Sequence, residues 1–139
     1  MSEEQAQQLL YQMQMLESYA SNLEQKDNAI LAYLREATSS IQSIRGLQNK
    51  EAESLIPVGL GTYLNAKVLG DSKVLQDIGA GVVVEKDPET AVNYLETRIK
   101  ELQVVLNETR AQRQDVMMRL EQLKDHMNSF IQSDNPAKQ

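Results

Sequence analysis

The sequence predicts a mainly α-helical fold, a long antiparallel two-helix coiled coil with two β-hairpins inserted between the helices. Three observations lead to this prediction: an apolar period of about 3.5 residues in both halves of the chain, the absence of proline before Pro57, and a middle segment rich in glycine and valine. Such a period is typical of left-handed coiled coils, because two helices must supercoil to keep the seam in contact. We expect residues 1–139 to form a single domain, divided into a first helix (2–54), the hairpins (55–86), a second helix (87–132) and a disordered tail (133–139).

The first helix is expected to begin at Ser2, which can cap it, and Gln5 completes a capping-box pattern three residues later. We expect the helix to end near residues 53–54, because Pro57 disfavours helical backbone angles at the residue before it. Its seam positions recur in steps of four and three and are apolar with two exceptions. They are Leu9, Met13, Leu16, Ala20, Leu23, Asp27, Ile30, Leu34, Ala37, Ile41, Ile44 and Gln48.

The middle segment contains an internal repeat that predicts two successive hairpins. The run Val58-Gly59-Leu60-Gly61 parallels Ile78-Gly79-Ala80-Gly81, and each run is flanked by residues typical of strands. The expected strands are Leu55–Val58, Thr62–Leu69, Lys73–Ile78 and Val82–Glu85. Two hairpins have little stability alone, and their unpaired edges invite another chain, so we interpret this segment as an assembly surface. The alternative is that the strands pack only onto their own helices.

The second helix is predicted by Asp87, a favoured capping residue, and by Pro88 at the first helical position. The helical pattern continues to about Ile131. Its seam positions also follow steps of three and four with two polar exceptions. They are Val92, Leu95, Ile99, Leu102, Leu106, Thr109, Arg113, Val116, Leu120, Leu123, Met127 and Phe130.

Pairing the two seams antiparallel places Asp27 opposite Arg113, the one charged residue in each seam. We expect the two termini to lie together, away from the middle segment. A buried polar pair of this kind can fix the register of two helices, and we interpret the two residues as a register pair. The alternative is that both are solvated charges at a partly open seam.

Composition excludes several function classes. The chain has no cysteine and one histidine, His126, so we expect no metal site, no cofactor and no catalytic residues. With 20 acidic and 14 basic residues the net charge is −6, which argues against nucleic-acid binding. No phosphate-binding loop, signal peptide or membrane-spanning run is present, so we expect a cytoplasmic protein that is not an enzyme.

The methionines gather near the two chain ends, at residues 1, 13, 15, 117, 118 and 127. Methionine is flexible and polarizable and is frequent at surfaces that accept many partners. Several apolar residues near these ends also lie off the seam. An adaptable apolar surface that grips exposed hydrophobic segments of other proteins is one interpretation; a loosely packed end of the coiled coil is the other.

The segments 56–68 (Ile-Pro-Val-Gly-Leu-Gly-Thr-Tyr-Leu-Asn-Ala-Lys-Val) and 74–86 (Val-Leu-Gln-Asp-Ile-Gly-Ala-Gly-Val-Val-Val-Glu-Lys) resemble the alpha-class subunit of prefoldin, of the archaeal type. The resemblance implies an α2β4 hetero-hexamer with beta-class subunits, in which the hairpins close into β-barrels. It also implies an ATP-independent holdase that binds unfolded proteins at its coiled-coil ends and delivers them to a group II chaperonin. Gln76 is polar where the family often has an apolar residue, so the facing of that strand is open.

Two sets of site residues follow. The candidate client-binding residues are Leu9, Leu10, Met13, Met15, Met127, Phe130 and Ile131. The candidate assembly residues are Tyr63, Leu64, Val68, Val74, Ile78, Val82 and Val84. The alternative function is a coiled-coil scaffold or adaptor that binds one specific protein partner.

Overall fold

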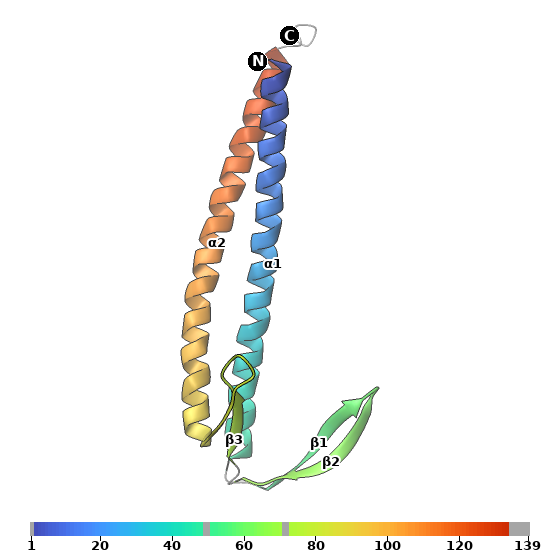
Figure 1. Cartoon of the computed structure of the whole chain (residues 1–139), viewed down its shortest axis with the longest axis vertical. Coiled ribbons are helices and arrows are strands. Elements are labelled where there is room, and N and C mark those ends of the chain that lie inside the picture. The colour runs from blue at the N-terminus through green and yellow to red at the C-terminus, as the bar shows by residue number, and fades with distance from the viewer. Residues whose placement is uncertain (1, 49–50, 71–72, 134–139) are drawn as a thin grey trace. The chain divides into compact units, whose positions relative to one another are not determined.

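The computed structural model describes residues 2–48, 51–70 and 73–133, and the structural statements below concern these residues. Two long helices carry two small antiparallel hairpins between them (Figure 1), which confirms the predicted fold class. The elements are α1 (Glu3–Leu47), β1 (Ala52–Gly59), β2 (Thr62–Val68), β3 (Val74–Asp77), β4 (Val83–Lys86) and α2 (Pro88–Ser133).

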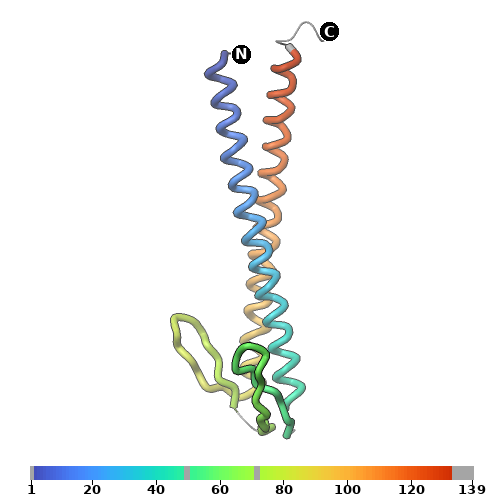
Figure 2. Tube along the Cα trace, turned by 90° about the vertical axis from the view of Figure 1, so that its right-hand side faces the viewer, coloured from blue at the N-terminus to red at the C-terminus, as the bar shows by residue number. Residues whose placement is uncertain are grey.

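The chain divides into two compact units, and both helices contribute to each. The terminal unit comprises Met1–Ala32 and Gln103–Gln139, and the hairpin unit comprises Tyr33–Leu102. Within the terminal unit the start of α1 and the end of α2 lie at the same end, side by side (Figures 1 and 2). The helices are therefore antiparallel in this unit, as the sequence predicts.

Helix α1 begins as its sequence predicts. The backbone N–H of Ser2 donates to Gln5 Oε1 at 3.0 Å, and the backbone N–H of Gln5 donates to Ser2 Oγ at 3.3 Å. This reciprocal pair is the predicted capping box, which satisfies backbone donors that the first turn leaves free. Glu3 and Glu4 occupy the first turn, where the helix dipole favours negative charge.

The predicted end of the first helix is wrong. Helix α1 ends at Leu47 rather than near residues 53–54, and β1 begins at Ala52 rather than at Leu55. Residues 52–54 are extended because they pair with residues 66–68 of β2. Backbone pairing with β2 therefore overrides their helical preference, and Gly46, a poor helix former, stands one residue before the actual end.

The two hairpins are separate two-stranded sheets. In the first, Ile56 pairs with Leu64 and Leu55 with Asn65, with a register shift between Pro57 and Gly59. In the second, Gln76 pairs with Val84 and Leu75 with Glu85. Apart from the early start of β1, the strand bounds lie within one residue of the predicted ones.

Helix α2 starts at Pro88, directly after the predicted cap. The side chain of Asp87 accepts hydrogen bonds from Thr90 Oγ1 at 3.0 and 3.1 Å, and its carbonyl accepts the N–H of Ala91 at 3.1 Å. The helix extends through Ser133, the first residue of the predicted tail. The rest of that tail, 134–139, lies outside the described residues.

The apolar seam is buried or half-buried at each position that the 3.5-residue period selects. In the terminal unit, Ala20, Leu23 and Val116 form a buried cluster with Leu16 packed against it. In the hairpin unit, Val92 at the start of α2 is fully buried. Neither helix has, within its described residues, an apolar stretch long enough to cross a membrane.

Candidate binding and assembly surfaces

The end of the terminal unit exposes large apolar side chains that the seam does not use. Among the predicted client-binding residues, Leu10, Met15 and Ile131 are about half exposed. Met13, Met127 and Phe130 are half-buried, and Leu9 is buried. The predicted set therefore divides into surface residues and residues that the two helices already use to pack.

Sequence reasoning left four exposed side chains of the same unit out of the predicted set. They are Tyr11, Tyr19, Met117 and Met118. All four lie off the seam. The sequence already indicates that Tyr11, Met117 and Met118 add apolar surface there, whereas Tyr19 is found only in the structure. The exposed apolar surface of the terminal unit is therefore the off-seam surface that the sequence indicates, enlarged by Tyr19.

A shallow apolar groove of about 420 Å³ runs between the two helices of the terminal unit. Its lining residues are Tyr11, Gln12, Met15, Leu16, Arg119, Gln122 and Leu123. Arg119 also makes an exposed ion pair with Asp115, 3.5 Å apart on the same helix. Apolar walls with a polar rim suit an apolar segment of another protein better than a charged ligand.

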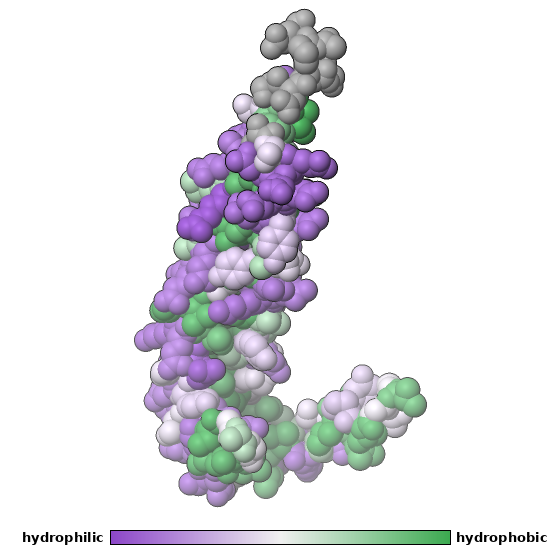
Figure 3. Space-filling model, turned by 45° about the horizontal axis from the view of Figure 1, so that its top comes forward, coloured by the Kyte–Doolittle hydropathy of each residue, from purple (hydrophilic) through white to green (hydrophobic). Residues whose placement is uncertain are grey.

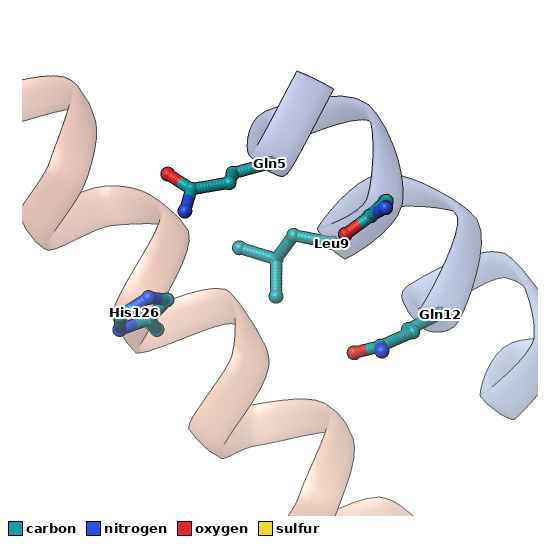
Figure 4. Close-up of a pocket in the computed structure, with 5 residues that line it drawn as sticks. Gln5, Leu9, Gln12 and His126 are labelled. Carbon is teal, nitrogen blue, oxygen red and sulfur yellow. The ribbon is translucent and has the colours of Figure 1, made fainter. Parts of the chain in front are cut away.

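A second hollow, of about 290 Å³, lies nearer the start of α1 and is mainly polar. Gln5, Leu9 and Gln12 of α1 line it, and His126 faces them from α2 (Figure 4). Within the described residues, no group of three or more His, Cys, Asp or Glu side chains could hold a metal ion, here or elsewhere. Amides and a single exposed imidazole are not an acid–base pair, so this hollow offers no evident catalytic chemistry.

A polar layer interrupts the seam of the terminal unit. Asp27 Oδ2 lies 3.7 Å from Arg113 Nη1, and it accepts a hydrogen bond from Arg110 Nε at 3.4 Å. Asp27 is 6% exposed, whereas both arginine side chains are about half exposed. The structure thus brings together the predicted pair, Asp27 and Arg113, and adds Arg110, which sequence reasoning missed. Thr109, also buried here, donates its hydroxyl to the carbonyl of Val105 at 2.8 Å.

We propose that this layer fixes the register of the helices and contributes little to stability. Among the described residues, Asp27 Oδ1 is buried without a hydrogen-bond partner, which costs free energy. Asp27→Leu removes that cost, and the half-exposed arginines can turn to water. The thermal midpoint is therefore expected to stay unchanged or to rise.

The register is expected to loosen in the same variant. A disulfide between Ile30→Cys and Thr109→Cys, in a chain with no native cysteine, reports the register, and Asp27→Leu should lower its yield by about half or more. Asp115→Leu is the matched control, because Asp115 pairs within its own helix. An unchanged disulfide yield in Asp27→Leu would contradict the register role.

The first hairpin exposes apolar side chains on both faces. The face that carries Ile56 and Leu64 continues with Ala66 and Val68, and is almost wholly apolar. The opposite face carries Leu55 and Tyr63 among polar residues. No residue of β1 or β2 is fully buried within this chain, and apolar side chains are visible on the surface of this hairpin (Figure 3), so its apolar faces have little cover of their own.

The second hairpin packs one face onto its own helix. Gln76 is 8% exposed, and its Nε2 donates to the carbonyl of Ala91 at 3.4 Å. On the same face, Lys86 Nζ lies 4.1 Å from the centre of the Tyr94 ring, a cation–π contact. The open facing of this strand is thereby resolved, because Gln76 and its cross-strand partner Val84 turn inward.

The outward face of the second hairpin carries Leu75, which is 73% exposed, and Val83. Neither belongs to the predicted assembly set. Of that set, Val68, Val74 and Val84 are half-buried within this chain, whereas Tyr63, Leu64, Ile78 and Val82 are exposed. Val74 and Val84 share the inward face of Gln76, so the outward apolar residues of these two strands are Leu75 and Val83, because side chains alternate along a strand.

The fold and these uncovered surfaces define a coiled-coil subunit with apolar surfaces suited to contacts with other proteins. Residues 16–133 match the family described as Prefoldin subunit. A Prefoldin subunit alpha of Nitrosopumilus maritimus is 51% identical over 134 residues, covering 96% of this chain and 92% of that protein. A Prefoldin subunit alpha of Methanoregula boonei is 37% identical over 117 residues, covering 78% and 74%.

Two solved structures share the fold. The prefoldin beta subunit from Thermococcus strain KS-1 superposes with a TM-score of 0.63 at 21% identity, covering 90% of each chain. A filamentous prefoldin from Methanocaldococcus jannaschii gives a TM-score of 0.56 at 22% identity, covering 89% of this chain and 98% of that one.

The chain belongs to the prefoldin family, and its similarity to alpha subunits confirms the resemblance drawn from the hairpin segments. Prefoldin subunits are non-enzymatic chaperone components, so the expectation that this chain is not an enzyme is also confirmed.

Proposed function

We propose that this chain is a subunit of a cytoplasmic, ATP-independent holdase that binds unfolded proteins and delivers them to a group II chaperonin. The observation that carries the proposal is the row of exposed apolar side chains at the end of the terminal unit, beside an apolar groove. Leu10, Met15 and Ile131 would make the first contacts. Met13, Met127 and Phe130 would add area where a client segment reaches the seam.

Each of these contacts is weak alone. A half-exposed aliphatic side chain gains about 1 kcal/mol when its remaining area is covered. Several subunits acting on one client raise the effective concentration of each further contact, so that weak contacts sum to useful retention. Such multivalent binding requires a subunit with a weak client-binding surface and a separate assembly surface, and the proposed arrangement has both.

For assembly we propose that the chain joins beta-class prefoldin subunits in an α2β4 hetero-hexamer through its hairpins. Exposed apolar faces on both hairpins and the unpaired edges of two-stranded sheets support this proposal. Closure of several hairpins into β-barrels would pair those edges and cover those faces.

The test is an aggregation assay on a denatured model protein. The assembled complex is expected to suppress aggregation without ATP, and addition of a group II chaperonin with ATP should then release folded protein. Binding to one protein alone, with no effect on unrelated denatured proteins, would contradict the holdase and favour the adaptor alternative.

A further inference from the structure

A methionine of the apolar groove belongs to a stripe of exposed side chains on α1. Tyr11, Met15 and Tyr19 follow one another at intervals of four residues, so they share one face of the helix. The three side chains are between 45% and 63% exposed, and Tyr11 and Met15 also line the groove. The Met15 side chain is therefore both part of the groove and open to small molecules in water.

Methionine is the only sulfur-containing residue type in this chain, because cysteine is absent. Mild oxidants such as hydrogen peroxide attack sulfur, and exposed side chains react before buried ones. Met15, Met117 and Met118 are each more than half exposed, whereas Met13 and Met127 are half-buried in the seam. Oxidation is therefore expected at the three exposed methionines before it reaches those that pack the helices together.

Of these three exposed methionines, Met15 is the one that lines the groove. Oxidation turns its apolar thioether into a polar sulfoxide. In the free groove, water or the N–H donors of Arg119 and Gln122, which also line it, can satisfy the sulfoxide oxygen. An apolar client segment removes water from that oxygen and supplies no donor in its place, so binding over the sulfoxide costs free energy.

We propose that hydrogen peroxide oxidises Met15 to methionine sulfoxide, that this weakens client binding at the groove, and that reduction restores it. A lone pair of the sulfur attacks one peroxide oxygen and the O–O bond breaks. Sulfur keeps that oxygen and loses two electrons, and the departing hydroxide takes the proton of the transferred OH to become water. The inference rests on the proposed function in one respect, namely that clients bind at the end of the terminal unit.

The reverse step needs a dithiol reductase of the methionine sulfoxide reductase class. Two thiols of the reductase are oxidised to a disulfide, the sulfoxide oxygen leaves as water, and the thioether is regenerated. Because the backbone and the seam of the helices are unchanged by this cycle, the modification acts on the binding surface and leaves the fold in place.

The first test compares each complex with its own peroxide-treated sample. The full chain is treated with hydrogen peroxide, freed of it with catalase and assembled with untreated beta-class subunits, and peptide mass spectrometry measures the oxidation of each methionine. The readout is the Kd for fluorescently labelled casein, an unfolded polypeptide. Treatment should raise this Kd about threefold or more for the unsubstituted chain and change it little for Met15→Leu, since leucine has a similar volume and does not react with peroxide.

Met117→Leu is the matched control, because Met117 is similarly exposed but does not line the groove. After treatment the control is expected to lose as much affinity as the unsubstituted chain. Reductases specific for the two sulfoxide epimers should then restore the affinity of both. Equal protection by the two substitutions, or an undiminished loss in Met15→Leu, would overturn the inference.

The second test is Met15→Gln, which places a polar side chain in the groove without any oxidant and keeps a good helix former. Its complex should bind casein about threefold or more weakly than the unsubstituted one, and peroxide should weaken it little further. Unchanged casein binding by a complex whose Met15 is oxidised would overturn this inference alone. An untreated complex that does not bind casein would instead contradict the proposed function, and the inference with it.

Discussion

Replacement of Leu10, Met15 and Ile131 by glutamine is expected to weaken client binding by at least about tenfold and to leave the assembly intact. Each side chain is about half exposed, so covering the rest of it contributes about 1 kcal/mol. Three such contacts in one copy amount to about 3 kcal/mol, of which ordering costs on binding remove a part. Glutamine is a good helix former, so the helices should persist.

The matched control replaces Tyr33 and Val104 by glutamine. Both side chains are at least as exposed and lie on the same two helices, but away from the chain ends. The readouts are the affinity for a fluorescent denatured client and the mass of the complex. Equal losses in the two variants would show that any exposed apolar residue suffices, and would contradict a binding surface at the end of the terminal unit.

Replacement of Leu75 and Val83 by lysine is expected to break the assembly while the free subunit stays folded. These residues lie on the outward face of the second hairpin, opposite Glu85 and Asp77 across the strands. In the free chain each lysine gains an acidic neighbour, so the hairpin itself is not penalised. In an assembled interface each copy would lose two apolar contacts of about 1–2 kcal/mol each, which weakens association by about thirtyfold or more.

Glu85→Lys is the control for this variant. It places a lysine on the same face, beside Leu75, but removes no apolar area. Size-exclusion chromatography with light scattering distinguishes the two, and circular dichroism checks the helices. An intact complex from the double variant would show that the outward face is not buried on assembly, and would favour hairpins that pack only onto their own helices.

Much of the fold could be predicted because its signals are local and repeated. The seam of each helix follows from a period that only one helical geometry satisfies, and the helix starts follow from Ser2 with Gln5 and from Asp87 with Pro88. The glycine corners predicted both hairpins for a similar reason, since left-handed backbone angles restrict the residue type.

The features that sequence missed depend on pairing between distant segments. Helix α1 ends early because residues 52–54 pair with β2, and nothing local to those residues announces that partner. The sequence does not show which face of β3 points inward, because Gln76 is polar. In the structure Gln76 is buried, and its amide donates a hydrogen bond to the carbonyl of Ala91. The ion pair of Arg110 with Asp27 could not be read from the seam pattern, because Arg110 lies beside the seam. Its long side chain nevertheless reaches the seam residue Asp27.

The first hairpin buries so little of its surface that, in a subunit without partners, this segment is only weakly stabilised. A two-stranded sheet without a fully buried residue opens often in water, and an open segment is accessible to proteases. Subunits made in excess of their partners would then be cleared first, while assembled ones are protected. The exposed hairpin would in this way help to keep the amount of each subunit close to the amount that complete complexes contain.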